Sequence, residues 1–405
     1  TWHDIFWLNA AVGVAIAVAL IRYLPSRDRR RLDLLSIALL SLTAVCWLLV
    51  MLQPPVLLEG VTTGLAFLPL VGESRWLSPL ALAGIGLLGW FVVRQLTSAA
   101  PLIDLRQWVE TAKQVDLLGA TLLAVSLGAV IITFASAEPE KSVIGTDALL
   151  SIPVAVVSAG AFIWRQRTAL EPLVPPNSLS KRPAWGAIVV SFFVGSALIA
   201  ALVDIPFFAR LTISGSSQLD AALVLIQFLI ALPIGAVLGG WLSRFVDSAK
   251  LTSAAMALSG LCFLLMSHWH EDSLNTALAT ATLATCGLGF GLAIAPVNAA
   301  LLAHTAAEVH GLASGLLVVA RMVGMLIGIS ALTTIGLRAF HHATSKIAPV
   351  EEICGSTQSC AAYATALQDA GVSQLQAVFA GAAIAAFIAA TLAFWLLRDT
   401  ANVTS

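Results

Sequence analysis

Arg321 is a charged residue inside an apolar run, GLLVVARMVGMLIG, that otherwise suits a lipid bilayer. It lies thirteen residues after Glu308. At ~1.5 Å per residue it would be roughly 20 Å along a helix, past the middle of a core ~30 Å thick. A charge there is costly, so we expect burial against other helices. Two roles stay open: a packing arginine satisfied by carbonyls and water, or half of an ion pair that opens when its carboxylate partner is protonated.

Asp204 is the partner for Arg321 that the sequence offers, because no other carboxylate lies in the apolar part of the six C-terminal helices. On this hypothesis the two residues couple protonation to movement. Asp204 also lies near the expected outer end of its helix, six residues before Arg210. It could instead be an interfacial acid that pairs with Arg210, and the partner of Arg321 would then lie outside this chain.

Gln227 and Asn298 are intramembrane amides of the same region, and Met322 and Met325 flank Arg321 on its C-terminal side. We expect these four residues to lie on a substrate path, although amides also hold helices together without touching a ligand. Small residues and one proline should allow close helix packing or bending. They are Pro233, Gly235, Gly287, Gly289, Gly291, Gly324 and Gly328.

The loop expected at 337–373 contains Cys354 and Cys360, which are close enough in sequence to form a disulfide in an oxidising compartment. This loop is long for a membrane protein, so it could extend the adjoining helices outward. A periplasmic lipoprotein or lipid chaperone could dock there. The alternative is a stapled surface loop that has no partner.

Several function classes are excluded by the sequence. No nucleophile, base and orienting group occur together, so we expect no enzyme, no catalytic residue and no cofactor. His268, His270 and Glu271 have the spacing of a weak metal site, but interfacial polarity explains them better, and we expect no metal. The net charge of −1 and the lack of a basic stripe argue against nucleic acid.

The composition indicates an all-α polytopic membrane protein, because 59% of the residues are hydrophobic and only 11% are charged. Apolar runs of helical length predict about eleven transmembrane helices. Their expected ranges are 5–24, 33–53, 76–96, 115–136, 146–165, 184–210, 218–243, 250–268, 275–300, 308–336 and 374–397.

The orientation follows from the lysines and arginines. A cytoplasmic C-terminus places fifteen of the 21 in cytoplasmic loops and five outside, with Arg321 inside the membrane. We therefore expect a multi-pass protein of the inner (cytoplasmic) membrane. Eleven helices would leave Thr1 outside without a signal peptide, so we expect this chain to be the C-terminal portion of a longer protein.

A repeat in the first half defines the expected domains. DLLSIALL at Asp33 matches DLLGATLL at Asp116, and FVVRQLTSAAPL at Phe91 matches FIWRQRTALEPL at Phe162. Each copy predicts a pair of helices. The expected divisions are a last helix of an N-terminal half with a basic loop at 1–31, helix pairs at 32–113 and 114–180, and a six-helix bundle at 181–405.

Several segments resemble the 14-helix drug:proton antiporters of the major facilitator superfamily: WHDIFWLN at 2–9, PLIDLR at 101–106, GLGFGLAIAP at 287–296 and HGLASGLLVVARMVG at 310–324. FLIALPIGAVLGGW at 228–241 is nearer to an actinobacterial branch that exports lipids and drugs with a periplasmic lipoprotein. The resemblance implies a C-terminal half preceded by one N-half helix and two linker pairs, with the first five helices absent. Gly239, Gly240 and Arg244 resemble a cytoplasmic motif, although Ser243 replaces its usual acid.

The predicted function is proton-coupled export of lipids, such as triacylglycerols, or of lipophilic drugs by the longer protein. The apolar helices suit such a substrate, with membrane lipids as neighbours. The alternative from another class is a non-transporting membrane scaffold or envelope-assembly protein.

Overall fold

A computed structural model describes residues 33–72, 74–98, 101, 116–135, 148–169, 172–175, 178–213, 218–354 and 360–398, together with Gly13. The chain forms two compact units, 1–114 and 115–405. The described residues contain only helices, turns and irregular segments. Ten of these helices are long and apolar enough to cross a membrane. The prediction of an all-α polytopic membrane protein is confirmed, while the helix expected at 5–24 lies outside the described residues apart from Gly13.

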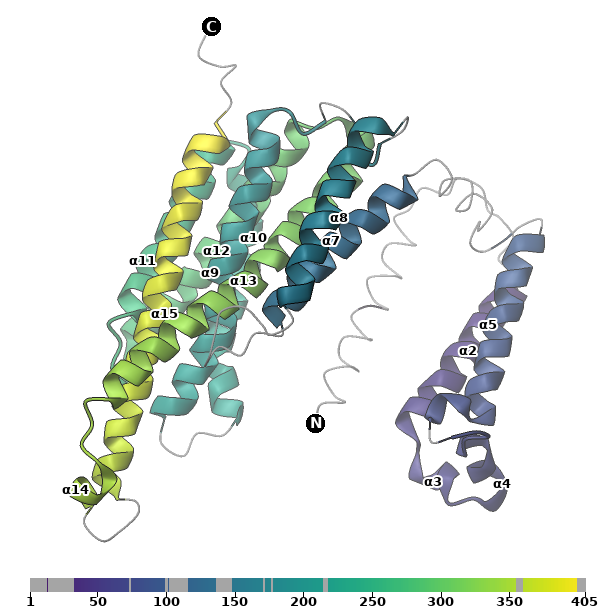
Figure 1. The fold of residues 1–405 in the computed structure, drawn as a ribbon, viewed down its shortest axis with the longest axis horizontal. Helices are drawn as coiled ribbons and strands as arrows, with labels where there is room; N and C mark the ends of the chain where they lie inside the picture. The colour runs from purple at the N-terminus through teal and green to yellow at the C-terminus, as the bar shows by residue number, and fades with distance from the viewer. Residues whose placement is uncertain are drawn as a thin grey trace, which may run out of the picture. The chain divides into compact units, whose positions relative to one another are not determined.

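The first unit contains a helical hairpin of α2 (Leu34–Leu52) and α5 (Pro79–Thr97). An ion pair joins the open end of this hairpin: the Arg94 Nη2 and Asp33 Oδ1 atoms are 2.9 Å apart. Asp33 also caps α2 through the Ser36 N–H, and Gln95 donates to the Ser36 hydroxyl at 2.7 Å. At the other end, α3 (Pro55–Leu58), α4 (Val61–Gly64) and two short 3-10 turns, η1 (Leu65–Phe67) and η2 (Arg75–Leu77), connect the helices (Figure 1).

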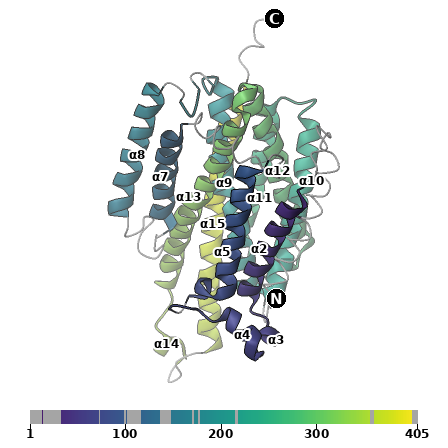
Figure 2. The same cartoon turned by 90° about the vertical axis from the view of Figure 1, so that its right-hand side faces the viewer.

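The second unit begins with a hairpin built in the same way, from α7 (Leu117–Ala135) and α8 (Ala148–Thr168). Asp116 accepts from the Gly119 N–H at 3.0 Å and from Arg165 Nε at 3.1 Å. Asp116 therefore occupies in this hairpin the place of Asp33 in the first, and Arg165 that of Arg94. The helix α7 lies beside α13 (His310–Thr344), as Figure 2 shows.

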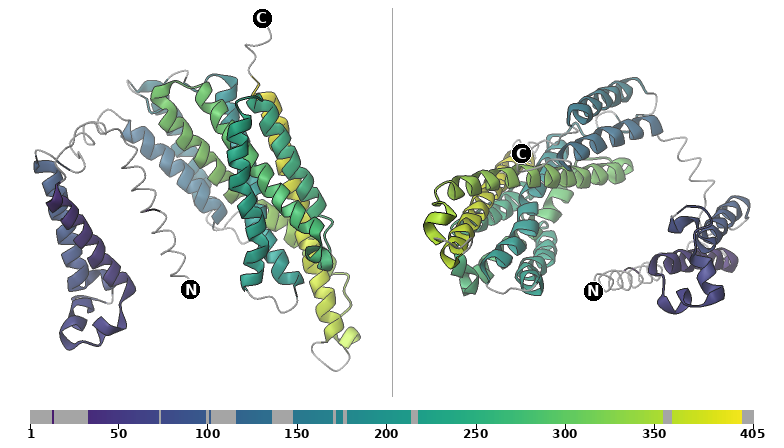
Figure 3. Two further views of the ribbon diagram at one scale, coloured as in Figure 1. Left: turned by 180° about the vertical axis from the view of Figure 1, so that it is seen from behind. Right: turned by 60° about the horizontal axis from the view of Figure 1, so that its bottom comes forward.

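The rest of the second unit is a bundle of six long helices (Figure 3). They are α9 (Arg182–Thr212), α10 (Gln218–Leu242), α11 (Ser248–Met266), α12 (Ala277–Ala303), α13 and α15 (Ala361–Leu396), with short turns η3 (Glu271–Asn275), η4 (Ala307–Val309) and α14 (Val350–Cys354) between them. Aromatic side chains fill its centre, where Phe208, Phe263 and Trp269 all contact Phe379 with ring centroids 6.3 Å apart.

The last two long helices extend beyond their predicted limits. The helix expected to end at 336 continues to Thr344, and the helix expected from 374 begins at Ala361. Most of the loop expected over 337–373 is therefore helical, and the expectation that this segment extends the adjoining helices is confirmed. The reason is that the segment AAYATALQDA is rich in alanine and other helix formers, so the helix continues where the apolar pattern ends.

Glycines allow α10 and α12 to pack with their backbones in close contact. A Cβ atom built on Gly291 would lie 2.0 Å from the Leu232 oxygen, and one on Gly287 would lie 2.2 Å from the Phe228 oxygen. Gly235 and Gly239 face the Leu288 and Leu292 oxygens in the same way from α10. Helices in a bilayer associate largely through such close packing, because burying apolar surface gives little gain there.

Replacement of Gly291 by Ala should destabilise the bundle. The added methyl group meets backbone on α10, which cannot rotate away, and overpacking of this kind costs about 1–3 kcal/mol. Thermal unfolding of the purified full-length protein in detergent would show a lower midpoint for Gly291→Ala. Gly315→Ala on α13 is the matched control, because nothing lies within 4 Å of its added Cβ. Equal midpoints for the two variants would contradict close backbone contact at Gly291.

Acid should loosen the first hairpin. The Arg94 guanidinium and the Ser36 hydroxyl lower the pKa of Asp33 to about 2, below its unfolded value of about 3.9. The stabilisation from Asp33 is therefore present above about pH 4 and lost as the pH falls toward 2. Spin labels at the exposed positions Leu35 and Val93 would report a broader distance distribution at low pH, and Asp33→Asn would show the same broadening at pH 7. If Asp33→Asn at pH 7 gave a distance distribution as narrow as that of a Glu59→Gln control, the proposed role of the ion pair would be contradicted.

Candidate functional site

The guanidinium of Arg321 lies against α9. Its Nε atom donates to the Ser191 hydroxyl at 3.3 Å, and the side chain is half-buried. Within the described part of the chain, Arg321 forms no ion pair. The structure thus provides a hydroxyl on α9 as its partner, a weaker partner for a cation than a carboxylate.

Close packing of α9 and α13 fixes the position of Arg321. A Cβ atom on Gly195 would lie 2.1 Å from the Arg321 carbonyl oxygen, so the two backbones touch at this residue. One turn away on either side, Ser191 donates to the Leu317 oxygen at 3.1 Å and Ser196 donates to the Gly324 oxygen at 2.9 Å. The depth of the arginine in the bundle is therefore set by the main chain.

Asp204 lies too far along α9 to pair with Arg321. It follows Ser191 by thirteen residues, which is roughly 20 Å of helix. No ion pair of Asp204 occurs within the described residues, so the structure provides neither the expected pair with Arg321 nor the alternative with Arg210.

The face of α9 that carries Asp204 is directed toward α15. A Cβ on Gly186 would touch Leu396, and Leu211 lies against Gly371. Asp204 is eighteen residues after Gly186, which is five helical turns, so it shares this face. It therefore lies on a different side of α9 from Ser191, which contacts α13.

Gln227 is the polar residue of α10 at about the same level as Asp204. Asp204 precedes the end of α9 by eight residues and Gln227 follows the start of the antiparallel α10 by nine. The Gln227 Oε1 atom is buried and has no hydrogen-bond partner among the described residues. An unsatisfied buried acceptor is costly, and it is a common mark of a place where a ligand or water binds.

The other residues expected on a substrate path do not form one group. Asn298 donates through Nδ2 to the Ile294 oxygen of its own helix at 2.8 Å, so its amide nitrogen has a partner without a ligand. Met325 packs against the core, whereas Met322 is 51% exposed. The structure therefore does not bring these three side chains together at Gln227.

The segment Gly239–Arg244 ends α10. Gly239 packs on Leu292, a Cβ on Gly240 would lie 3.8 Å from Ala295, and the Ser243 hydroxyl donates to the Gly239 oxygen at 2.7 Å. Ser243, the residue directly after α10, therefore satisfies a carbonyl oxygen of the last turn of the helix. The remaining small residues behave alike: Gly324 and Gly328 pack on α9, and Gly289 packs on Ser259 of α11.

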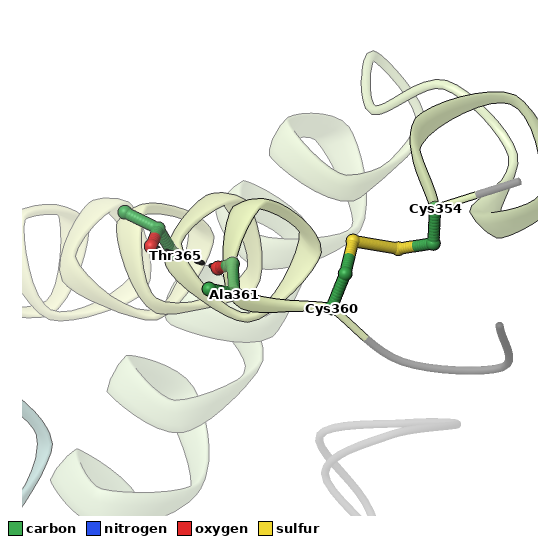
Figure 4. Close-up of a disulfide and its surroundings, with 4 residues drawn as sticks. All are labelled: Cys354, Cys360, Ala361 and Thr365. Atoms are coloured by element: carbon green, nitrogen blue, oxygen red, sulfur yellow. Dashed lines mark hydrogen bonds between the residues drawn. A yellow bond between two sulfur atoms is a disulfide. The ribbon is translucent and has the colours of Figure 1, made fainter.

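A disulfide joins Cys354 of α14 to Cys360, the residue before α15 (Figure 4). It lies at the end of the bundle where α13 and α15 extend past the neighbouring helices, as Figure 1 shows. We call this the disulfide end. The hairpin ion pair Asp116–Arg165 is at the start of α7 and the end of α8.

One polar cluster at the disulfide end was not predicted from the sequence. Gln376 of α15 donates to the Trp269 oxygen at 2.7 Å, and the neighbouring Glu271 has a buried Oε1 atom without a partner among the described residues. Burial, together with the nearby carboxylates Asp369 and Asp272, raises the pKa of Glu271. No pattern in the sequence signals this contact, because Glu271 and Asp369 are far apart along the chain and only the fold brings them together.

No protein-family model matches the chain, but comparison with known proteins finds relatives that bear the name triacylglyceride transporter. A triacylglyceride transporter of Mycolicibacterium smegmatis is 36% identical over 302 residues, which cover 71% of this chain and 54% of that protein. A triacylglyceride transporter of Mycolicibacterium hassiacum is 38% identical over 242 residues (57% and 45%), and a probable one of Mycobacterium leprae is 37% identical over 240 residues (56% and 47%). The chain spans about half the length of the curated relatives it matches. It is similar, over most of its own length, to part of mycobacterial proteins that bear the name triacylglyceride transporter.

Proposed function

We propose that the full-length protein exports lipids, triacylglycerols first among them, or lipophilic drugs across the inner membrane by coupling export to proton entry. The names of its relatives support a lipid substrate. The apolar bundle supports a substrate with few polar groups, because a permease for sugars or amino acids needs more amides and charges inside its helices.

The observation that carries this proposal is Arg321, a cation fixed between two transmembrane helices with no acidic partner among the described residues. A carboxylate on the other half of the transporter would complete the pair. Protonation of that carboxylate would remove the attraction and let the two halves separate, which links proton binding to substrate release.

The architecture proposed for the whole protein is that of the major facilitator superfamily. The bundle α9–α15 would be the C-terminal half, and the two hairpins would be linker pairs between it and an N-terminal half. The C-terminus would be cytoplasmic, because this orientation keeps most lysines and arginines inside. The disulfide end would then be periplasmic, and a periplasmic lipoprotein could receive lipid at the extended ends of α13 and α15.

Replacement of Arg321 by Ala in the full-length protein should abolish proton-driven export. We expect the rate at which proteoliposomes move a fluorescent triacylglycerol under an imposed pH gradient to fall by about tenfold or more, which corresponds to ~1.4 kcal/mol. Arg338→Ala, at an exposed position on the same helix, is the matched control. Arg321→Lys should retain part of the activity because the charge remains.

If Arg321→Ala exported lipid at the same rate as the control, the proposed role of the Arg321 ion pair in proton coupling would be refuted. The alternative function, a membrane scaffold, predicts no export by any variant and unchanged assembly of the envelope when Arg321 is replaced. The same panel of variants therefore separates the two functions.

Asp204 is proposed as a second protonation site, separate from the carboxylate that would pair with Arg321. Asp204→Asn should leave lipid binding unchanged, since the amide has the same shape, but should weaken the dependence of the export rate on the imposed pH gradient, because one of two protonation sites is lost. Asp220→Asn, in the first turn of α10, is the control. A steep dependence on the pH gradient in Asp204→Asn, equal to that of the control, would exclude this role.

A further inference from the structure

The connection between α2 and α5 forms a cap whose surface is unusually apolar. It comprises residues 54–78 and lies outside the two flanking spans, which end at Leu52 and begin at Pro79. Five of its large apolar side chains, Leu65, Leu68, Leu70, Val71 and Trp76, are 45–72% exposed. Several exposed apolar side chains outside a spanning helix indicate an interaction surface or a ligand-binding groove.

A concavity of about 490 Å³ is hollowed into this cap. Its wall is apolar and its remaining lining is polar: the apolar residues include Leu58, Leu65, Phe67, Leu68 and Pro69, and the polar ones are Gln53, Glu59 and Arg75. The volume falls within the range of small-molecule sites, about 300–1,000 Å³.

Backbone conformation, hydrogen bonds and close packing together hold the cap in this shape. Gln53 adopts a left-handed conformation with φ of 42° and turns the chain away from the end of α2. The Thr63 hydroxyl donates to the Leu57 oxygen at 2.7 Å, and the Leu70 N–H donates to the Leu77 oxygen at 3.0 Å. A Cβ on Gly64 would lie 2.7 Å from the Leu58 oxygen, so the backbone is tightly folded beside the concavity.

The chemistry of the lining selects a lipid. Arg75 forms no ion pair with a described residue, and its guanidinium offers donors but no acceptor. Ester carbonyl oxygens are acceptors without charge, and the apolar wall matches a hydrocarbon chain. The concavity also includes Gln53, the residue after α2 leaves its span, so a lipid can enter it from the bilayer without crossing water.

We propose that residues 53–75 form a binding cup for one acyl chain of a neutral glycerolipid, whose ester carbonyls accept hydrogen bonds from Arg75. The choice of a neutral glycerolipid rests on the proposed function, but occupation of the cup does not require transport. The cup would hold lipid at the end of the hairpin that carries α3 and α4.

The cup can be tested by photolabelling the full-length protein in nanodiscs with a triacylglycerol that carries a diazirine in one acyl chain. Mass spectrometry of the digested protein should find labels on peptides within 53–75. Leu65→Glu and Leu68→Glu place charge in the apolar wall and should reduce this labelling by about tenfold. Leu68→Trp, which fills the concavity without charge, should reduce it as well.

The matched controls are Leu70→Glu and Val71→Glu, which alter equally exposed residues of the same cap that do not line the concavity. Their labelling should stay within about twofold of the unaltered protein, and all variants should elute alike in gel filtration. If the wall variants and the control variants lost labelling equally, the cap would only touch the bilayer and the proposed cup would be overturned. Labelling confined to the spanning helices would overturn it too.

The outcome of the photolabelling experiment does not depend on the export assay. Export that fails while labelling of 53–75 remains sensitive to Leu68→Trp would refute the proposed function and leave the cup standing. Export that proceeds while 53–75 stays unlabelled would refute the cup alone.

Discussion

Direct contact between helix backbones is the constraint on which the rest of the bundle depends. Lipid tails are as apolar as leucine side chains, so a membrane bundle gains little by hiding leucine and must gain from close approach. Such approach is seen at Gly195 and Gly324 between α9 and α13, and at Gly235 and Gly291 between α10 and α12. At these positions any larger residue would push carbonyl oxygens and helices apart. Glycine in the middle of a helix is otherwise unfavourable, which makes its use here a packing requirement.

The position of Arg321 follows from this packing. Because its own carbonyl lies against Gly195, the backbone has no freedom to retract the side chain, and Ser191 receives the guanidinium. The helix pair therefore fixes a charge inside an apolar layer at a defined depth. The separate face of α9 that carries Asp204 is directed toward α15, so Arg321 and Asp204 belong to different helix contacts.

The extent to which the sequence predicts this structure differs between features. The spanning helices follow from long apolar runs, and the two hairpins follow from a repeat whose polar landmarks are Asp33, Asp116 and the Arg-Gln pairs. The pairing of each aspartate with the arginine of its own copy could have been inferred from the repeat, since both residues recur at matching positions. The direction in which Asp204 and Gln227 face could not have been inferred from the sequence. The hydrophobic pattern of a helix that is buried on several sides carries little information about which neighbour each residue meets. An extension of α13 and α15 was expected, but their end residues could not be predicted, because helix propensity rather than hydrophobicity decides where they stop.

The length of α13 gives it the properties of a lever. From Arg321 to Thr344 it is continuous helix, and 23 residues at ~1.5 Å each make an arm of about 35 Å. A tilt of only about 5° at the arginine would displace the tip beside the disulfide by about 3 Å. The arm is stiffened by α15, which packs along it, and the bond between Cys354 and Cys360 fastens α14 to the start of α15 at that tip. Under the proposed function, a small change of charge beside Arg321 would become a larger movement at the tip of α13.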